Sequence, residues 1–195
     1  MSIVREVLQY SISDIARMGY SFICTKLFFK GAKLVRRPIV VRGKKAFKFG
    51  YGLSTGRNCR IEIFDNGEII MGDHCQIGDN CHLVASGRLR IGNDCLFASK
   101  VFVSDTSHGS YGIHGSAPDS EPVARPLIAE EVQIGDKVWL GENVVVLPGV
   151  SIGDGCVVGA NSTVSRSLPA NTISVGSPAK PIKYFDESSG CWEKL

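Results

Sequence analysis

One short polar stretch brings a carboxylate and an imidazole together, Ser104-Asp105-Thr106-Ser107-His108-Gly109. An imidazole titrates near neutral pH, so His108 could exchange a proton with a substrate group. Asp105 lies three residues earlier, and its carboxylate could hold the imidazole, contact a substrate or merely cap a turn. Acid–base chemistry is therefore what these residue types predict.

A long irregular segment follows His108. Residues 109–126 contain no repeat and are rich in glycine and proline. A long loop inside an otherwise regular fold is usually functional. We therefore expect a protruding loop that contacts substrate, and His114, which lies within this loop, could take part in that contact.

A six-residue period dominates the chain after the loop. From residue 134 to residue 169 a branched aliphatic residue recurs at every sixth position: Ile134, Leu140, Val146, Ile152, Val158 and Val164. Steps of six scatter around a helix, whereas six is even, so these positions all point inward in an extended chain. The pattern predicts a β-solenoid whose coils bury their inner faces by stacking.

The same period starts less regularly near residue 49 and places five cysteines at inward positions: Cys59, Cys75, Cys81, Cys95 and Cys156. We expect small buried residues there, because no pair has the C-x-x-C spacing of a zinc site and free thiols suit a reducing compartment. His82 points outward, since Cys81 and Leu83 take the inward positions, and it could be functional or solvated. His74 also points outward, and we expect it to be solvated.

The N-terminal quarter differs from the rest in charge. Residues 1–48 contain 11 Lys or Arg against 2 acidic residues, and residues 49–195 contain 11 against 17. Apolar residues spaced by three and four predict an amphipathic helix within residues 2–33. This segment could cap the open end of the solenoid, or it could also contact a membrane surface or an anionic glycan. Neither a signal peptide nor a membrane span is predicted, which favours the cytoplasm.

These repeats, His108 with its neighbours, and the stretch Val175-Gly176-Ser177-Pro178-Ala179-Lys180-Pro181 resemble the hexapeptide-repeat acyltransferases. The sugar O-acetyltransferases of lipopolysaccharide and capsule synthesis are most similar, with galactoside and maltose acetyltransferases more distant. The resemblance covers residues 49–185 and implies an all-β fold, a left-handed parallel β-helix. We expect an N-terminal helical cap at residues 1–48, the protruding loop at 109–126 and a tail at 186–195.

The resemblance also implies a role for individual residues. His108 corresponds to the general base of the family, with Asp105 as its possible partner, and His82 and His114 lie where acceptor contacts are expected. Acetyl-CoA would be the acyl-donor substrate, and a backbone amide near Gly141 or Glu142 would stabilise the oxyanion. The residues expected to contact CoA are Trp139, Gly141, Glu142, Gly159, Ala160, Arg166, Pro178, Lys180 and Lys183.

The function implied is transfer of an acetyl group from acetyl-CoA to a sugar hydroxyl in lipopolysaccharide or capsular polysaccharide synthesis. The relatives are homotrimers with sites between subunits, and no metal, prosthetic group or nucleic acid is expected. One alternative is acetylation of a sugar amine, an amino acid or an antibiotic. More remote alternatives are a γ-type carbonic anhydrase, which needs three histidine ligands for zinc, and a non-catalytic β-helix. The sequence leaves the acceptor and the pathway open.

Overall fold

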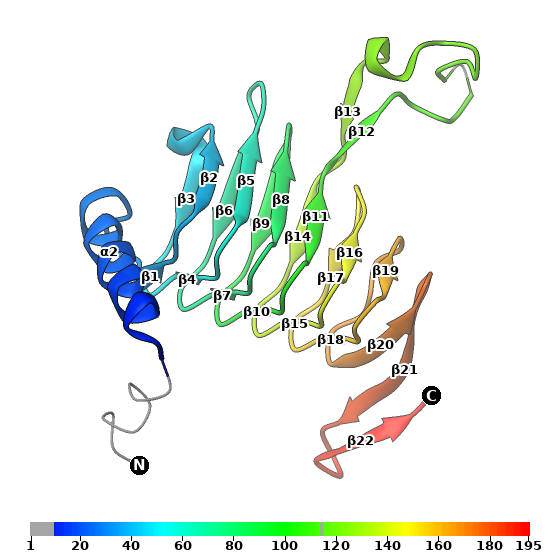
Figure 1. The fold of residues 1–195 in the computed structure, drawn as a ribbon. Coiled ribbons are helices and arrows are strands. Elements are labelled where there is room, and N and C mark those ends of the chain that lie inside the picture. The colour runs from blue at the N-terminus through cyan, green and yellow to red at the C-terminus, as the bar shows by residue number, and fades with distance from the viewer. Residues whose placement is uncertain (1–9, 114) are drawn as a thin grey trace.

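Short parallel strands wind into a three-sided stack of coils (Figure 1). The computed structural model describes residues 10–113 and 115–195. Each coil contributes one strand to each of three sheets, so strands that are neighbours in a sheet lie about one coil apart in the sequence. The expected parallel β-helix is thereby confirmed.

The strands of the three sheets have the following bounds. The first sheet contains β1 (Leu34–Val35), β4 (Ser54–Thr55), β7 (Gln76–Ile77), β10 (Leu96–Phe97), β15 (Trp139–Leu140), β18 (Val157–Val158) and β20 (Thr172–Gly176). The second contains β2 (Ile39–Arg42), β5 (Cys59–Ile63), β8 (His82–Ala85), β11 (Phe102–Ser104), β16 (Val145–Val146) and β19 (Thr163–Val164). The third contains β3 (Phe47–Phe49), β6 (Glu68–Met71), β9 (Arg88–Ile91), β14 (Val132–Ile134) and β17 (Ser151–Ile152).

The six-residue period fills the interior of this stack. Leu140, Val146 and Ile152 come from the three sides of a single coil, and all three are buried. The five periodic cysteines are buried beside them as free thiols, as expected. Their sulfur atoms lie close to backbone carbonyl oxygens of the next coil, at 3.1 Å for Cys59 to Gly78. These cysteines therefore serve packing.

Asp and Asn side chains tie the corners between the third and first sheets. Each accepts a hydrogen bond from a backbone N–H one coil earlier: Asp73 from Tyr51, Asn93 from Asp73, Asp136 from Asn93 and Asp154 from Asp136. A glycine precedes each acceptor at this corner because space is short. A Cβ on Gly72, for example, would lie 2.4 Å from the Asn93 Oδ1 atom. The Gly-Asp and Gly-Asn pairs of the repeat thus have a structural cause.

The N-terminal segment contains a helix and also the first coil. Helix α2 (Ile12–Phe28) begins after Ser11, whose hydroxyl accepts a hydrogen bond from the Asp14 N–H. This confirms a helix within residues 2–33 from Ile12 onward, and the apolar positions before residue 10 lie outside the described residues. Strands β1 to β3, with the 3₁₀ turn η1 (Lys44–Ala46), pair in parallel with β4 to β6. The solenoid therefore begins at Leu34, inside the range expected to form the cap.

The other end of the stack is closed by antiparallel strands. Strand β21 (Ala179–Asp186) pairs with β20, and β22 (Cys191–Lys194) pairs with β21. The tail expected at residues 186–195 is therefore part of a sheet, and Trp192 packs edge-on against Phe185 with 5.4 Å between ring centroids. Covering a terminal strand in this way protects an edge that would otherwise pair with another chain. Among the described helices, none is long and apolar enough to cross a membrane.

Candidate active site

A two-stranded ribbon leaves the stack where the second sheet turns into the third. Strand β12 (Thr106–His108) follows β11 and pairs in an antiparallel manner with β13 (Leu127–Ala129), which leads into β14. The loop between them carries the 3₁₀ turn η2 (Pro122–Ala124) and protrudes far from the coils (Figure 1). His108 is the last residue of β12, opposite Leu127, and its side chain is exposed. The structure thus presents the imidazole on a hydrogen-bonded support at the base of the loop.

Asp105 is fully buried beneath the ribbon and binds the backbone of a neighbouring coil. Its carboxylate accepts hydrogen bonds of 2.9 Å from the Ser86 and Gly87 N–H groups and a further one from the Thr106 hydroxyl. These contacts satisfy two backbone donors at the corner from which the ribbon departs. The geometry therefore favours turn capping over the alternative of a direct contact with the imidazole.

Arg125 organises the loop. Its guanidinium donates hydrogen bonds to the hydroxyl and carbonyl oxygens of Ser120 and to the Tyr111 hydroxyl, and it also lies 5.9 Å from the centre of the Tyr111 ring. The Tyr111 hydroxyl in turn donates to the His108 carbonyl oxygen at 2.6 Å. The loop is therefore linked to the backbone of the catalytic candidate. His114 lies outside the described residues.

His82 lies on the outer face of the second sheet and pairs with a buried carboxylate. Its Nε2 atom is 2.9 Å from Glu62 Oε2, and its ring lies 5.4 Å from that of Phe102 on β11. Glu62 is 5% exposed and also contacts the guanidinium groups of Arg60 and Arg42. The imidazole is thus held in a fixed orientation one strand away from β11, which continues into the ribbon.

Glu62 and Arg125 are site candidates that the sequence did not reveal. The alternation along β5 places Arg60 and Glu62 on the outer face, but it gives no sign that Glu62 is buried beneath a histidine. Arg125 stands in a segment without any periodicity, so its contacts with Ser120 and Tyr111 had no pattern to predict them.

Most residues expected to contact CoA follow one another across three coils. Trp139 lies half-exposed on β15, and Gly141 lies at the following corner. A Cβ on Gly141 would lie 2.6 Å from the Ala160 nitrogen of the next coil, and a Cβ on Gly159 would lie 2.8 Å from Val175 of the coil after that. Glycine at both positions therefore allows neighbouring coils to approach closely. We call this run of residues along the first sheet and its following corner the strip.

The C-terminal hairpin continues this strip, whereas Arg166 does not. Pro178 lies in the turn between β20 and β21, and Lys180 and Lys183 follow on β21, opposite Val175 and Ile173. Arg166 instead follows β19, at the corner between the second and third sheets. Arg166 therefore lies at the same corner of the stack as the ribbon, unlike the other residues expected to contact CoA.

The backbone amide of Gly141 takes part in the hydrogen bonding between coils. The Gly141 N–H donates to the Val158 carbonyl oxygen at 2.8 Å, so this amide holds the stack together and does not point at a substrate. Of the two amides expected to stabilise the oxyanion, at Gly141 or Glu142, the one at Gly141 is thus already hydrogen-bonded within the stack. The carboxylate of Glu142 forms an exposed ion pair with Lys100 at 3.0 Å.

Within one chain, the ribbon and the strip lie on different sides of the three-sided stack. The strip follows the first sheet and its corner with the second, whereas His108 leaves from the corner between the second and third sheets. Figure 1 shows the ribbon extending away from the row of strands β7, β10, β15 and β18. The chain therefore does not bring His108 and Trp139 to one edge of the coil stack.

In the part of the chain that the structure describes, no three His, Cys, Asp or Glu side chains gather as metal ligands would.

Comparison with known proteins gives consistent results. Residues 131–166 match the family described as "Bacterial transferase hexapeptide (six repeats)". WbbJ of Escherichia coli (strain K12), whose name assigns it to lipopolysaccharide biosynthesis as an O-acetyl transferase, is 38% identical over 194 residues, which are 98% of this chain and 99% of WbbJ. The galactoside O-acetyltransferase of the same organism is 31% identical over 138 residues, 69% of this chain and 64% of that enzyme.

A solved structure extends the similarity of the fold. A variant of AntD, an N-acyltransferase from Bacillus cereus in complex with dTDP-4-amino-4,6-dideoxyglucose and coenzyme A, superposes with a TM-score of 0.69. The match covers 92% of each chain at 20% identity. This likeness therefore concerns the fold.

Proposed function

Because the chain belongs to the hexapeptide-repeat family of bacterial acetyltransferases, we propose that it transfers an acetyl group from acetyl-CoA to a sugar hydroxyl. The acceptor is a sugar of a surface polysaccharide, such as lipopolysaccharide or capsule. The observation that carries this proposal is the match to WbbJ over nearly the whole of both chains, together with an exposed His108 on the ribbon.

The reaction is a direct transfer. The hydroxyl oxygen of the sugar attacks the thioester carbonyl carbon while the His108 imidazole takes the hydroxyl proton. The tetrahedral intermediate carries a negative oxygen, for which the Glu142 amide is the proposed donor, since the Gly141 amide is already bonded to Val158. The intermediate then expels the CoA thiolate, which receives the proton from His108. No covalent enzyme intermediate is needed.

The active unit is proposed to be a homotrimer with sites between subunits. Support comes from the placement of His108 and Trp139 on different sides of the coil stack, because a neighbouring copy could bring one to the other. His82, fixed by Glu62, is assigned to the acceptor, and Lys180 and Lys183 to the CoA phosphates. The free cysteines suit a reducing compartment, so the proposed location is the cytoplasm.

Replacing His108 tests the chemistry. His108→Ala should lower kcat by roughly 10²- to 10⁴-fold, the usual contribution of a general base, while acetyl-CoA still binds. The assay measures thiol release from acetyl-CoA with nucleotide sugars and with lipid-linked or polymeric glycans, and mass spectrometry identifies the product. His74→Ala is the matched control, because His74 is exposed in a coil near the N-terminus. Undiminished turnover by His108→Ala would remove the base assignment.

The second candidate function is acyl transfer to a sugar amine. Its support is the likeness to the N-acyltransferase AntD, which concerns the fold alone. The product mass with paired amino and hydroxy sugars separates the two acceptor classes.

A further inference from the structure

Helix α2 packs against the solenoid through its polar side. Ser21, Cys24 and Thr25 are its buried residues. The Thr25 hydroxyl accepts a 2.9 Å hydrogen bond from the Val35 N–H, and the Ser21 hydroxyl accepts one of 3.1 Å from the Arg37 N–H. An ion pair of 3.3 Å between Asp14 and Arg57 holds the start of the helix. These contacts fix which side of the helix faces the coils.

The apolar side of the helix consequently faces outward. Ile12 is 88% exposed and Leu27 is 70% exposed, and the other large apolar residues exposed on this side are Ile15, Tyr20, Phe22 and Ile23. An amphipathic helix on a globular protein ordinarily buries this side. Large apolar residues exposed together on one side of a helix mark an interaction site.

Positive charges border this apolar face. Arg17, Lys26 and Lys30 belong to the helix or follow it directly, and all three are exposed. Lys26 lies 5.2 Å from the centre of the Phe22 ring, so one cation stands within the apolar face itself. The charge of the whole segment agrees, with 11 basic against 2 acidic residues in positions 1–48.

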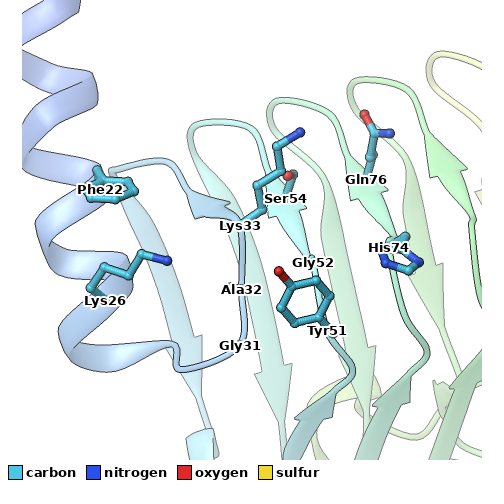
Figure 2. A pocket seen from close by; sticks show the side chains of 10 residues that line it. All are labelled: Phe22, Lys26, Gly31, Ala32, Lys33, Tyr51, Gly52, Ser54, His74 and Gln76. Atoms are coloured by element: carbon cyan, nitrogen blue, oxygen red, sulfur yellow. The ribbon is translucent and has the colours of Figure 1, made fainter.

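A basic pocket opens beside the helix (Figure 2). It has a volume of about 610 Å³, and its lining includes Lys26, Lys33, Tyr51 and His74. Within residues 10–113 and 115–195, neither lysine forms an ion pair with a carboxylate. Asp94 approaches His74 at 3.5 Å. The two lysines thus leave positive charge available for a phosphate group.

We propose that helix α2 docks this enzyme on an anionic phospholipid surface. The apolar face enters the boundary between headgroups and acyl chains, while Lys26, Lys30 and Lys33 contact lipid phosphates. A second copy of the chain is a poorer occupant, because two such faces would bring their basic residues together. The inference does not depend on the reaction, since it rests on the exposed helix and its charges.

Co-sedimentation with lipid vesicles tests the proposal. The wild-type protein should bind vesicles of phosphatidylcholine containing phosphatidylglycerol, and it should bind much less to phosphatidylcholine alone or at high salt. The double variant Lys26→Glu/Leu27→Glu should bind the anionic vesicles at least about tenfold less tightly. Lys194→Glu/Leu195→Glu makes the same chemical change at the opposite end of the solenoid and should bind like the wild type (Figure 1).

Circular dichroism and thermal unfolding check that the variants fold, and Ile23→Ser/Leu27→Ser provides a milder change on the same face. Failure of the wild-type protein to prefer anionic vesicles would overturn the proposal, as would full binding by both helix variants. Sedimentation equilibrium measures the subunit number without lipid. If the helix variants change that number, the face is a subunit contact and the proposal is wrong.

Discussion

At the scale of single residues, the two acidic side chains near the histidines have distinct surroundings. Asp105 is buried against the backbone of Ser86 and Gly87, whereas Glu62 is buried against the side chain of His82. A carboxylate that satisfies backbone donors chiefly stabilises the fold, whereas one that holds a partly exposed imidazole can influence substrate binding. The three-residue spacing of Asp105 and His108 could not separate these roles, because it says nothing about the coil below.

Asp105→Ala should therefore lower stability more than catalysis. The change leaves the partly buried Ser86 and Gly87 N–H groups without a partner, which should lower the free energy of unfolding by about 1–3 kcal/mol for each group. Chemical denaturation measures the loss, and Asp119→Ala, in the exposed part of the loop, is the control that should change stability by less than about 0.5 kcal/mol. Unchanged stability combined with a collapse of kcat would instead assign Asp105 to the imidazole.

At the scale of elements, the loop between β12 and β13 makes its side-chain hydrogen bonds within its own segment. Arg125 ties the loop to Tyr111 and Ser120, whereas the base of the ribbon contacts the coils through Thr106, which bonds Ser86. In the stack itself, β11 and β14 occupy regular positions, because each pairs with strands of the coil before and the coil after it. The loop can therefore vary without altering the solenoid.

Replacing residues 109–126 by Asn-Gly should abolish acetylation of the acceptor sugar while CoA binding is retained. Asn-Gly suits a two-residue hairpin turn and would join His108 to Leu127, which are already paired. We expect calorimetry to give an unchanged affinity for CoA and the sugar assay to give no product. Arg125→Ala, which keeps the loop but removes its internal contacts, should mainly raise KM for the acceptor. Full activity of the shortened protein would show that the loop does not select the acceptor.

How much the sequence predicts differs among elements for physical reasons. The coils from 134 to 169 were predictable because their inward residues recur without interruption, and Leu140, Val146 and Ile152 are buried as that pattern requires. The first coil was not predicted, since Leu34 and Val35 lack the glycine corners of the repeat. The outward orientation of the apolar face of α2 was also not predictable, because periodicity identifies such a face but does not show whether it is buried.

At the scale of the whole molecule, the triangular cross-section separates the two halves of the proposed site. His108 departs from one corner, and Trp139 belongs to the sheet opposite that corner. The proposed homotrimer requires that each ribbon reach the strip of a neighbouring copy. The same separation explains why the site could not be assembled from one chain's repeat pattern.

Mixing two inactive proteins tests this arrangement. When His108→Ala and Trp139→Ala chains are combined in equal amounts, roughly a quarter of the sites between subunits receive both intact residues. Activity should therefore rise in the co-expressed mixture well above that of either variant alone. If the mixture stays inactive while each variant binds CoA or folds normally, both residues act within one chain.

The constant spacing of the coils also fixes the distance between helix α2 and the ribbon. Neighbouring strands of a sheet lie about 4.8 Å apart, so the coil that carries the ribbon stands roughly 14 Å beyond the first coil, against which α2 packs. If the helix lies on lipid, the solenoid is a spacer that holds His108, the proposed base, at a fixed height above the headgroups. Insertion or removal of a whole coil between them would change that height in steps of one strand spacing, and so would select acceptors by how far their glycan extends from the membrane.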